Sequence, residues 1–471
     1  MKIPSQVLGT VVALLLSACA VDQSPVGPGT PTGENAPQQS FSAGDVHLFV
    51  LTEERGPSAE LVRTINLAGG QLARQHDEIG VLTVVGLSDE DARSIAARQD
   101  VDDVGRDMML EWIPPTDLTG FQVVTLPENH TDQNAAVLID LQWYLDVINA
   151  KKAWNVGRQG RGALVCVLDT GVDPGHLDLA GRVDLDKAVS FVPSEPFIED
   201  FAFHGTFVSS LIATNGIGMA SVAPHARICP VKVLESIGEN AGSGSFDWLI
   251  AGIVFSARKR ADVINMSLGA IVNRREARAL IWALRRAIHY ANRHGTLVVA
   301  AAGNSAVNFD DFPDFIHVPS GLRDVISVSA TAPLAQMNFD ALASYSNFGK
   351  RAVDVAAPGG DFLPDQGGVL GDLILGACSS FITECASGAS YLLGGGTSFA
   401  SPLVAATGAV IESNAHRHRD ADHLEACIIA GADQIDGKRF SPFYGHGRID
   451  VFDSVTKRFC GSKTPHGYKD W

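Results

Sequence analysis

The chain has 471 residues, of which 46% are hydrophobic and 19% charged, and this composition is typical of a globular protein. The length allows two or three domains, with a large core in at least one of them. The formal net charge of −17 argues against a nucleic-acid partner, because phosphate binding needs a basic surface.

Residues 1–19 have the pattern of an export signal. Lys2 precedes an apolar run over 7–16, which is shorter than the roughly 20 residues that a transmembrane helix needs. "LSAC" resembles the bacterial lipoprotein box, in which the cysteine, here Cys19, is lipidated; a plain signal peptide with an incidental cysteine is the alternative. Residues 20–44 are rich in Pro, Gly and polar residues and predict a flexible tether. We expect an exported protein, envelope-anchored or extracellular, that meets the membrane only through its lipid.

Residues 45–112 predict a small α+β unit. Strands are expected in "DVHLFVLT", "IGVLTVVGL" and "VDDVGRD", with helical stretches between them. The second helical stretch follows Ser88, a good N-cap, and has acidic residues in its first turn. This β-α-β-α-β order within a short span suggests a split βαβ fold. A polar connection, 113–140, follows the unit.

The region 141–459 predicts a doubly wound α/β domain, and 460–471 a C-terminal tail. Amphipathic helical stretches such as 276–294 alternate with strand-like runs. Strands that are apolar on both faces are typical of a parallel sheet covered by helices on both sides. The runs lie at 163–168, 227–234, 262–268, 296–302, 324–330 and 352–357.

Polar residues stand where these strands end and where helices begin. Asp169 follows the first strand, Asn304 follows the fourth, and His204 opens a helix between the first two strands. Ser398 lies in "GGGTSFASP", where we expect a helix to begin with Pro402 in its first turn. Each residue alone has an ordinary explanation as a cap, a turn residue or a structural histidine. Because parallel sheets place functional residues at the carboxyl ends of their strands, we expect these residues to share a cleft.

"DTGVD", "HGTFVSSLIA" and "GTSFASP", in this order, resemble the three signature segments of the subtilisin-like serine proteases. "VAPHARICPVKVL", "DVINMSLG", "VVAAAGN", "APGG" and "GHGRIDVFDSV" agree with the same family. The resemblance covers about 141–459 and implies a subtilisin-like peptidase domain acting on protein or peptide substrates.

The resemblance assigns roles to these residues. It implies a catalytic triad of Asp169, His204 and Ser398, with Ser398 as the nucleophile of an acyl-enzyme mechanism and the Asn304 amide in the oxyanion hole. It also implies an extended substrate that pairs with two or three segments of the chain as an added strand. These substrate-binding positions are Gly242, Ser243, Gly244, Ser267, Leu268, Gly269, Ala302 and Gly303.

The region 45–112 resembles the inhibitory propeptide of the same family, more loosely. It implies a zymogen whose own propeptide blocks the cleft and whose processing bond lies within 113–140. The chain departs from the family at Phe207, where a second histidine is usual and where phenylalanine can pack in the core. No metal is expected, because the loop that holds calcium with an aspartate matching Asp178 in some relatives is altered here.

Six cysteines remain beyond Cys19, and an even number in an exported chain permits disulfides. Cys378 and Cys385 bracket a short loop and are the best candidate pair. Cys166 and Cys229 lie in strand-like runs where burial without a bond is the simplest expectation. No CxxC pair is present, so a structural zinc site is not predicted.

Three other functions were weighed. An aspartic protease needs two signature aspartates, and "DTG" occurs once, at 169–171. The nucleophile elbow of an α/β-hydrolase needs a glycine where Ala400 stands, although His423 and His446 follow the serine as that fold requires. A non-catalytic binding protein on the same scaffold is disfavoured because all three triad residue types are present.

Overall fold

The computed structural model describes residues 46–114, 122–126, 136–157, 159–238, 241–414 and 420–457. The predicted signal, tether and C-terminal tail, with Cys19, lie outside these ranges, as does much of the predicted connection. No helix within the described ranges is long and apolar enough to cross a membrane.

Residues 46–114, here called the N-terminal unit, form a four-stranded antiparallel sheet with two helices. The sheet order is β2-β3-β1-β4, which with the chain order β-α-β-β-α-β is the split βαβ arrangement. The structure contains one strand more than expected, β2, which pairs with β3. The elements are β1 (Val46–Leu51), α1 (Ala59–Leu67), β2 (Gln71–His76), β3 (Val81–Val85), α2 (Asp89–Ala96) and β4 (Val101–Arg106), followed by β5 (Met109–Ile113).

Residues 136–457, here called the large domain, are built on one mainly parallel sheet. Its order is β17-β16-β14-β12-β7-β9-β8, with β18 paired to β16, and only β17 runs antiparallel to its neighbour. This confirms the predicted doubly wound α/β class. The strands are β7 (Leu164–Asp169), β8 (Val189–Ser190), β9 (Arg227–Lys232), β12 (Val263–Met266), β14 (Leu297–Ala301), β16 (Ile326–Leu334), β17 (Met337–Leu342) and β18 (Val355–Pro358).

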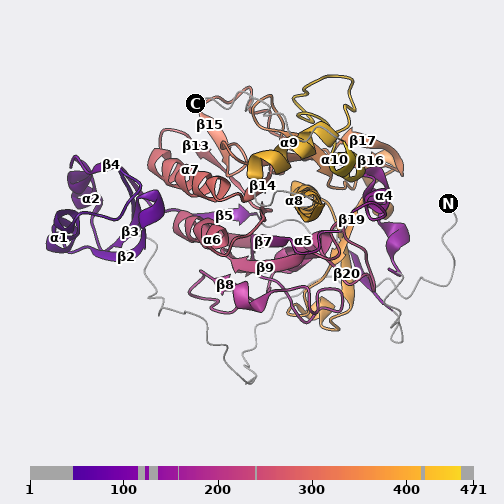
Figure 1. Ribbon diagram of the computed structural model, residues 1–471, viewed down its shortest axis with the longest axis horizontal. Coiled ribbons are helices and arrows are strands. Elements are labelled where there is room, and N and C mark those ends of the chain that lie inside the picture. Colours follow the sequence, from indigo (N-terminus) through magenta and orange to yellow (C-terminus); the bar gives the residue numbers. More distant parts are fainter. Residues whose placement is uncertain are drawn as a thin grey trace.

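Helices cover both faces of this sheet (Figure 1). On β7, Val165 and Val167 pack in the core with one helix layer, whereas Leu164, Cys166 and Leu168 pack in the core with the other. Both faces of the strand are therefore apolar, as expected of a buried parallel strand. The first layer contains α5 (His204–Ile212) and α8 (Thr397–Asn414), and the second α6 (Phe246–Arg258) and α7 (Arg278–Arg293).

Shorter elements complete the large domain. The strands form small sheets in the orders β10-β11-β5, β13-β15 and β19-β20-β6, so two strands from before residue 136 pair with this domain. The strands are β6 (Gln122–Thr125), β10 (Glu235–Gly238), β11 (Ala241–Ser245), β13 (Ala270–Asn273), β15 (Phe315–Val318), β19 (Ile374–Ala377) and β20 (Ser390–Gly394), and the helices are α3 (Trp143–Val147), α4 (Ala150–Ala153), α9 (Ala421–Gly431) and α10 (Val451–Thr456).

Two disulfides are present in the described residues. Cys378 is bonded to Cys385, which is the predicted candidate pair. Cys166 is bonded to Cys229, although burial without a bond was the simpler expectation. The reason is register, because β7 and β9 are parallel neighbours that place these two cysteines directly opposite each other.

The N-terminal unit packs beside α6 and α7 of the large domain (Figure 1). Leu48 and Val81 of its sheet share one apolar core with residues of α6 and α7. Arg286 of α7 donates to the carbonyl oxygen of Leu51 at 2.7 Å, and Thr83 donates to Asp247 of α6 at 2.5 Å. The contact therefore combines apolar burial with polar bonds.

Candidate active site

Two of the predicted catalytic residues meet where β7 ends and α5 begins. His204 Nδ1 lies 2.8 Å from Asp169 Oδ1, and both side chains are buried. The backbone N–H of Thr170 donates to the same carboxylate oxygen at 2.8 Å. The imidazole is therefore held through Nδ1, which leaves Nε2 as the nitrogen available to a substrate or nucleophile.

Asp200, a buried carboxylate that no sequence motif indicated, helps to position Asp169 and His204. Asp200 accepts the backbone N–H groups of Ala202 and Thr206, and the Thr170 hydroxyl at 2.8 Å. Burial raises the pKa of Asp200. These bonds tie the loop before His204 to the residue after Asp169, so Asp200 positions both members of the pair. In the sequence, only its position four residues before His204 could have indicated this role.

Ser398 lies at the start of α8, as its glycine-rich approach predicts, and its hydroxyl donates to the Ser267 carbonyl oxygen at 3.2 Å. Within the described residues, the hydroxyl makes no hydrogen bond to His204. The helices that contain the two residues pack against each other, and the His204 ring centroid is 6.0 Å from that of Phe399, the residue after Ser398. Rotation of the Ser398 hydroxyl away from Ser267 is therefore needed before it can bond to the imidazole.

We expect Pro402 in the first turn of α8, and this prediction is wrong. Pro402 is the sixth residue of that helix. Since proline has no N–H, the Ser398 carbonyl lacks its usual intrahelical donor. The Ser267 hydroxyl supplies a substitute and donates to that carbonyl at 2.7 Å. The proline thus links the helix behind Ser398 to the loop that follows β12.

Asn304 follows β14 and faces the same point as Ser398. Its Oδ1 accepts the backbone N–H of Thr397 at 2.9 Å and the Thr397 hydroxyl at 2.6 Å, so the amide Nδ2 is turned the other way. A methyl carbon placed on Gly396 would lie 3.5 Å from Asn304 Nδ2 and 3.7 Å from the backbone nitrogen of Ser398. Both nitrogen atoms therefore border the space beside Gly396, where the resemblance expects the oxyanion donors.

The predicted substrate-binding segments surround a strand from the N-terminal unit. β5 pairs antiparallel with β11, which contains Gly242, Ser243 and Gly244. On its other side, the backbone N–H of Gly269 donates to the Trp112 carbonyl oxygen at 2.9 Å. An extended chain thus already lies between two of the segments expected to bind substrate.

The other predicted binding positions lie close by. Leu268 is buried in the apolar core, and Gly303 donates its backbone N–H to the Thr397 hydroxyl at 3.1 Å. The Ala302 carbonyl oxygen accepts from the Asn347 amide at 2.8 Å. The loop after β14 is thus bonded to the start of α8 through Gly303 and to Asn347 through Ala302.

Phe207, the departure from the family pattern, lies fully buried on α5 and stacks on Phe399 with ring centroids 4.0 Å apart. Asp178, the other position of interest, accepts backbone N–H groups from Ile217, Gly218 and Met219, and the Tyr391 hydroxyl. Its carboxylate is thus used to hold the altered loop. The described residues contain no group of three or more His, Cys, Asp or Glu side chains placed to hold a metal ion.

A family model described as the subtilase family matches residues 160–447, which include every residue of the site above except those of β5. The chain belongs to the subtilase family. This is a family of subtilisin-like serine endopeptidases, as the relatives show. Thermitase of Thermoactinomyces vulgaris is 31% identical over 311 residues, covering 65% of this chain and 93% of thermitase. The thermophilic serine proteinase of Bacillus sp. (strain AK1) is 33% identical over 309 residues, covering 64% of each chain.

Solved structures show the same fold. The epidermin leader peptide processing serine protease of Staphylococcus aureus superposes with a TM-score of 0.70 at 22% identity, covering 88% of this subtilase and 99% of that chain. Fervidolysin of Fervidobacterium pennivorans superposes with a TM-score of 0.67 at 22% identity, covering 89% of this subtilase and 61% of that chain. The predicted subtilisin-like fold is confirmed.

Proposed function

We propose that this subtilase is an active serine endopeptidase whose catalytic residues are Asp169, His204 and Ser398. The observation that carries the proposal is the buried hydrogen bond between Asp169 and His204, which leaves His204 Nε2 available as a base. Asn304 Nδ2 and the Ser398 backbone nitrogen, both within 4 Å of the Cβ position of Gly396, add support.

The proposed chemistry is acyl transfer. The Ser398 oxygen attacks the peptide carbonyl carbon while His204 takes the hydroxyl proton, and His204 then gives that proton to the leaving amine. Asp169 keeps the imidazole in the required tautomer and stabilises its charged form. Asn304 Nδ2 and the Ser398 N–H stabilise the oxyanion, assisted by the positive end of the α8 dipole. Water then hydrolyses the acyl-enzyme.

We further propose that the chain is made as an autoinhibited zymogen. Support comes from β5, which lies along β11 in the manner of an added substrate strand and so would exclude another chain. Trp112 of β5 is almost fully buried, and its indole N–H donates to the Gly244 carbonyl oxygen at 2.8 Å. Cleavage within 113–140 and loss of the N-terminal unit would open the cleft. Export and lipidation at Cys19 remain proposals that rest on the N-terminal sequence.

The test compares the wild-type chain with Ser398→Ala by intact mass, N-terminal sequencing and labelling with a serine-directed fluorophosphonate. We expect wild type to lose the N-terminal unit and to become labelled, and the variant to stay whole and unlabelled. Ser194→Ala is the matched control, because this serine is exposed and its hydroxyl donates to the Glu235 carboxylate. Labelling of the Ser398→Ala chain equal to wild type would refute the assignment, whereas identical processing of both would place the processing enzyme elsewhere.

A further inference from the structure

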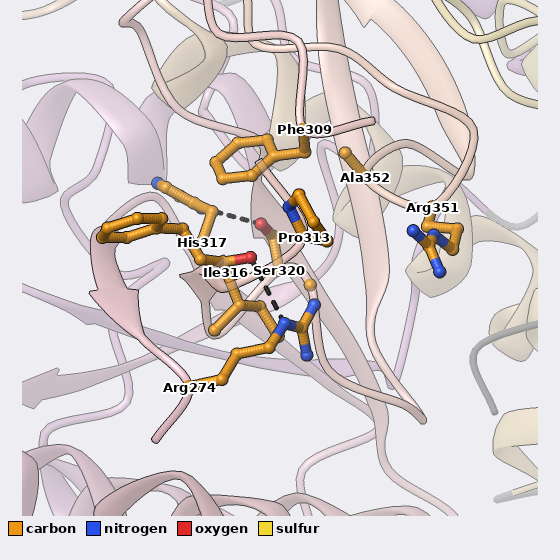
Figure 2. A pocket seen from close by; sticks show the side chains of 10 residues that line it. Arg274, Phe309, Pro313, Ile316, His317, Ser320, Arg351 and Ala352 are labelled. Carbon is orange, nitrogen blue, oxygen red and sulfur yellow. Dashed lines mark hydrogen bonds between the residues drawn. The ribbon is translucent and has the colours of Figure 1, made fainter. Parts of the chain in front are cut away.

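A cavity of about 100 Å³ lies beside His317 and Ser320 (Figure 2). This volume is well above the roughly 10–15 Å³ that one water molecule requires. Its lining combines the aromatic ring of Phe309 with four polar side chains, Arg274, His317, Ser320 and Arg351. None of the residues described as lining it is an aspartate or glutamate. The cavity is therefore a basic, partly apolar space.

His317 lines this cavity and also contacts two of the predicted substrate-binding residues. A Cβ atom added to Gly269 or to Gly303 would collide with the His317 imidazole, so the ring lies against both glycines. Gly269 is the residue that pairs with the Trp112 carbonyl, and Gly303 directly precedes Asn304. The ring thus stands between the backbone that binds an extended chain and the predicted oxyanion donor. A substrate side chain next to the reacting carbonyl would meet it.

A hydrogen bond to Ser320 fixes the orientation of the His317 ring. It is buried, and its Nδ1 lies 2.7 Å from the Ser320 hydroxyl oxygen, a contact drawn in Figure 2. Burial lowers the pKa of His317 to about 4, so the ring is neutral near pH 7. When Ser320 donates to Nδ1, the ring proton is on Nε2, the nitrogen nearest the Cβ position of Gly303. The cleft then faces an N–H donor.

Two guanidinium groups line the same cavity. Arg274 donates from Nε to the Phe315 carbonyl oxygen at 3.3 Å, and burial together with the nearby charge of Arg351 lowers its pKa. Both side chains are part of the cavity lining. An arginine or lysine side chain of a substrate would be repelled from this side of the cleft, and a carboxylate would be attracted.

We propose that His317 is a specificity-determining residue that, with Arg274 and Arg351 behind it, selects an acidic side chain directly before the scissile bond. The inference rests on the proposed endopeptidase function. The imidazole takes the space that a large aromatic substrate side chain would need, and its N–H suits a carboxylate acceptor. The class of substrate is a protein or peptide with glutamate or aspartate at that position.

The predicted connection is consistent with this preference. Residues 113–140 contain no lysine or arginine and one aromatic residue, Phe121. They contain four acidic residues, at which cleavage would release the N-terminal unit, namely Asp117, Glu128, Asp132 and Asp140. We expect the new N-terminus of the processed chain to follow one of them.

The test measures kcat and KM of the processed enzyme on peptides that differ only in the residue before the scissile bond, namely Glu, Gln, Phe or Lys. A charge-assisted hydrogen bond predicts a kcat/KM for Glu at least about tenfold above that for the isosteric Gln. His317→Gly should reduce this ratio at least about threefold and improve cleavage of the Phe peptide, because the space opens. N-terminal sequencing of the processed chain is the second readout.

A matched pair of variants keeps the test decisive if His317→Gly does not fold. Arg274→Gln should lower the Glu-to-Gln ratio, whereas Arg275→Gln, which removes the same charge from a side chain that is 88% exposed, should not change it. Equal or better cleavage of the Phe peptide by wild type, or equal ratios in the Arg274 and Arg275 variants, would overturn the inference. Failure to cleave any peptide would instead indicate failure of the proposed function.

Discussion

Asp107 should make the association of the N-terminal unit with the large domain dependent on pH. Its Oδ1 accepts the backbone N–H of Phe246 at 3.0 Å. Burial, together with the carboxylate of Asp247, raises the pKa of Asp107 from 3.8 to about 7. Because Phe246 and Asp247 belong to the other partner, the pKa should return to its ordinary value once the N-terminal unit dissociates.

The direction of the effect follows from proton linkage. A raised pKa in the complex means that association takes up a proton, so the contribution of Asp107 is complete below pH 3.8 and is lost as the pH rises through about 7. At pH 8 the loss is about 4 kcal/mol at most, taking about 1.4 kcal/mol for each pKa unit. This corresponds to a dissociation constant raised by up to roughly 10³.

His76 of the same contact acts in the opposite direction. Burial lowers the pKa of His76 from 6.5 to about 4, so its contribution is complete above pH 6.5 and is lost as the pH falls through about 4. At pH 8 this histidine is neutral in both states. A comparison at pH 8 therefore isolates the effect of Asp107.

The assay follows full-length chains at pH 8 and records the delay between cleavage, seen by gel, and the appearance of peptidase activity. Asp107→Asn keeps an oxygen acceptor for Phe246 but removes the buried charge, so the delay should lengthen by at least about tenfold, well within the upper bound above. Asp89→Asn is the control, because Asp89 bonds to His47 within the N-terminal unit. A delay in Asp107→Asn equal to or shorter than that of wild type would refute the reasoning.

Two further predictions concern the catalytic side of the site. Asn304→Ala should lower kcat by about 10²–10³ with little change in KM, a magnitude taken from the equivalent loss in subtilisin. Steady-state kinetics measures both constants. A fall in kcat of less than about fivefold would contradict the oxyanion role. Phe207→Ala should lower the free energy of unfolding by about 3–5 kcal/mol, because it removes the buried stack on Phe399. Urea unfolding in the inactive Ser398→Ala background measures this, and a loss under about 1 kcal/mol would show that the core closes around the cavity.

Sequence reasoning predicted the large domain well because its signals are local. Each apolar run that alternates with an amphipathic helix contains its own evidence for a strand, and the sheet confirms the doubly wound class. Asp169, His204, Asn304 and Ser398 could be proposed for the same reason, since each lies at or near the end of a strand or the start of a helix. The sequence also placed Phe207 on an apolar helix face, where it is buried.

What the sequence could not supply depends on contacts between distant segments. The Cys166–Cys229 bond follows from the register of two parallel strands, which no local pattern contains. The extra strand β2 has mixed polar composition, and pairing with β3 rather than propensity makes it a strand. Pro402 could be recognised as a helix signal, but the Ser267 hydroxyl that donates to the Ser398 carbonyl in place of the missing N–H comes from a residue 131 positions earlier in the chain.

The sequence alone thus determined the family resemblance, the order of the chemistry-bearing residues and the class of the fold, because these depend on neighbours along the chain. Only the tertiary structure decided that β5 lies along β11, that Asp107 is buried beside Asp247, and that His317 stands between Gly269 and Gly303. Each of these depends on which surfaces meet once apolar area has been buried. Burial then shifts the pKa of a carboxyl group such as Asp107. The packing of distant segments determines which side chain, here His317, contacts the predicted substrate-binding glycines.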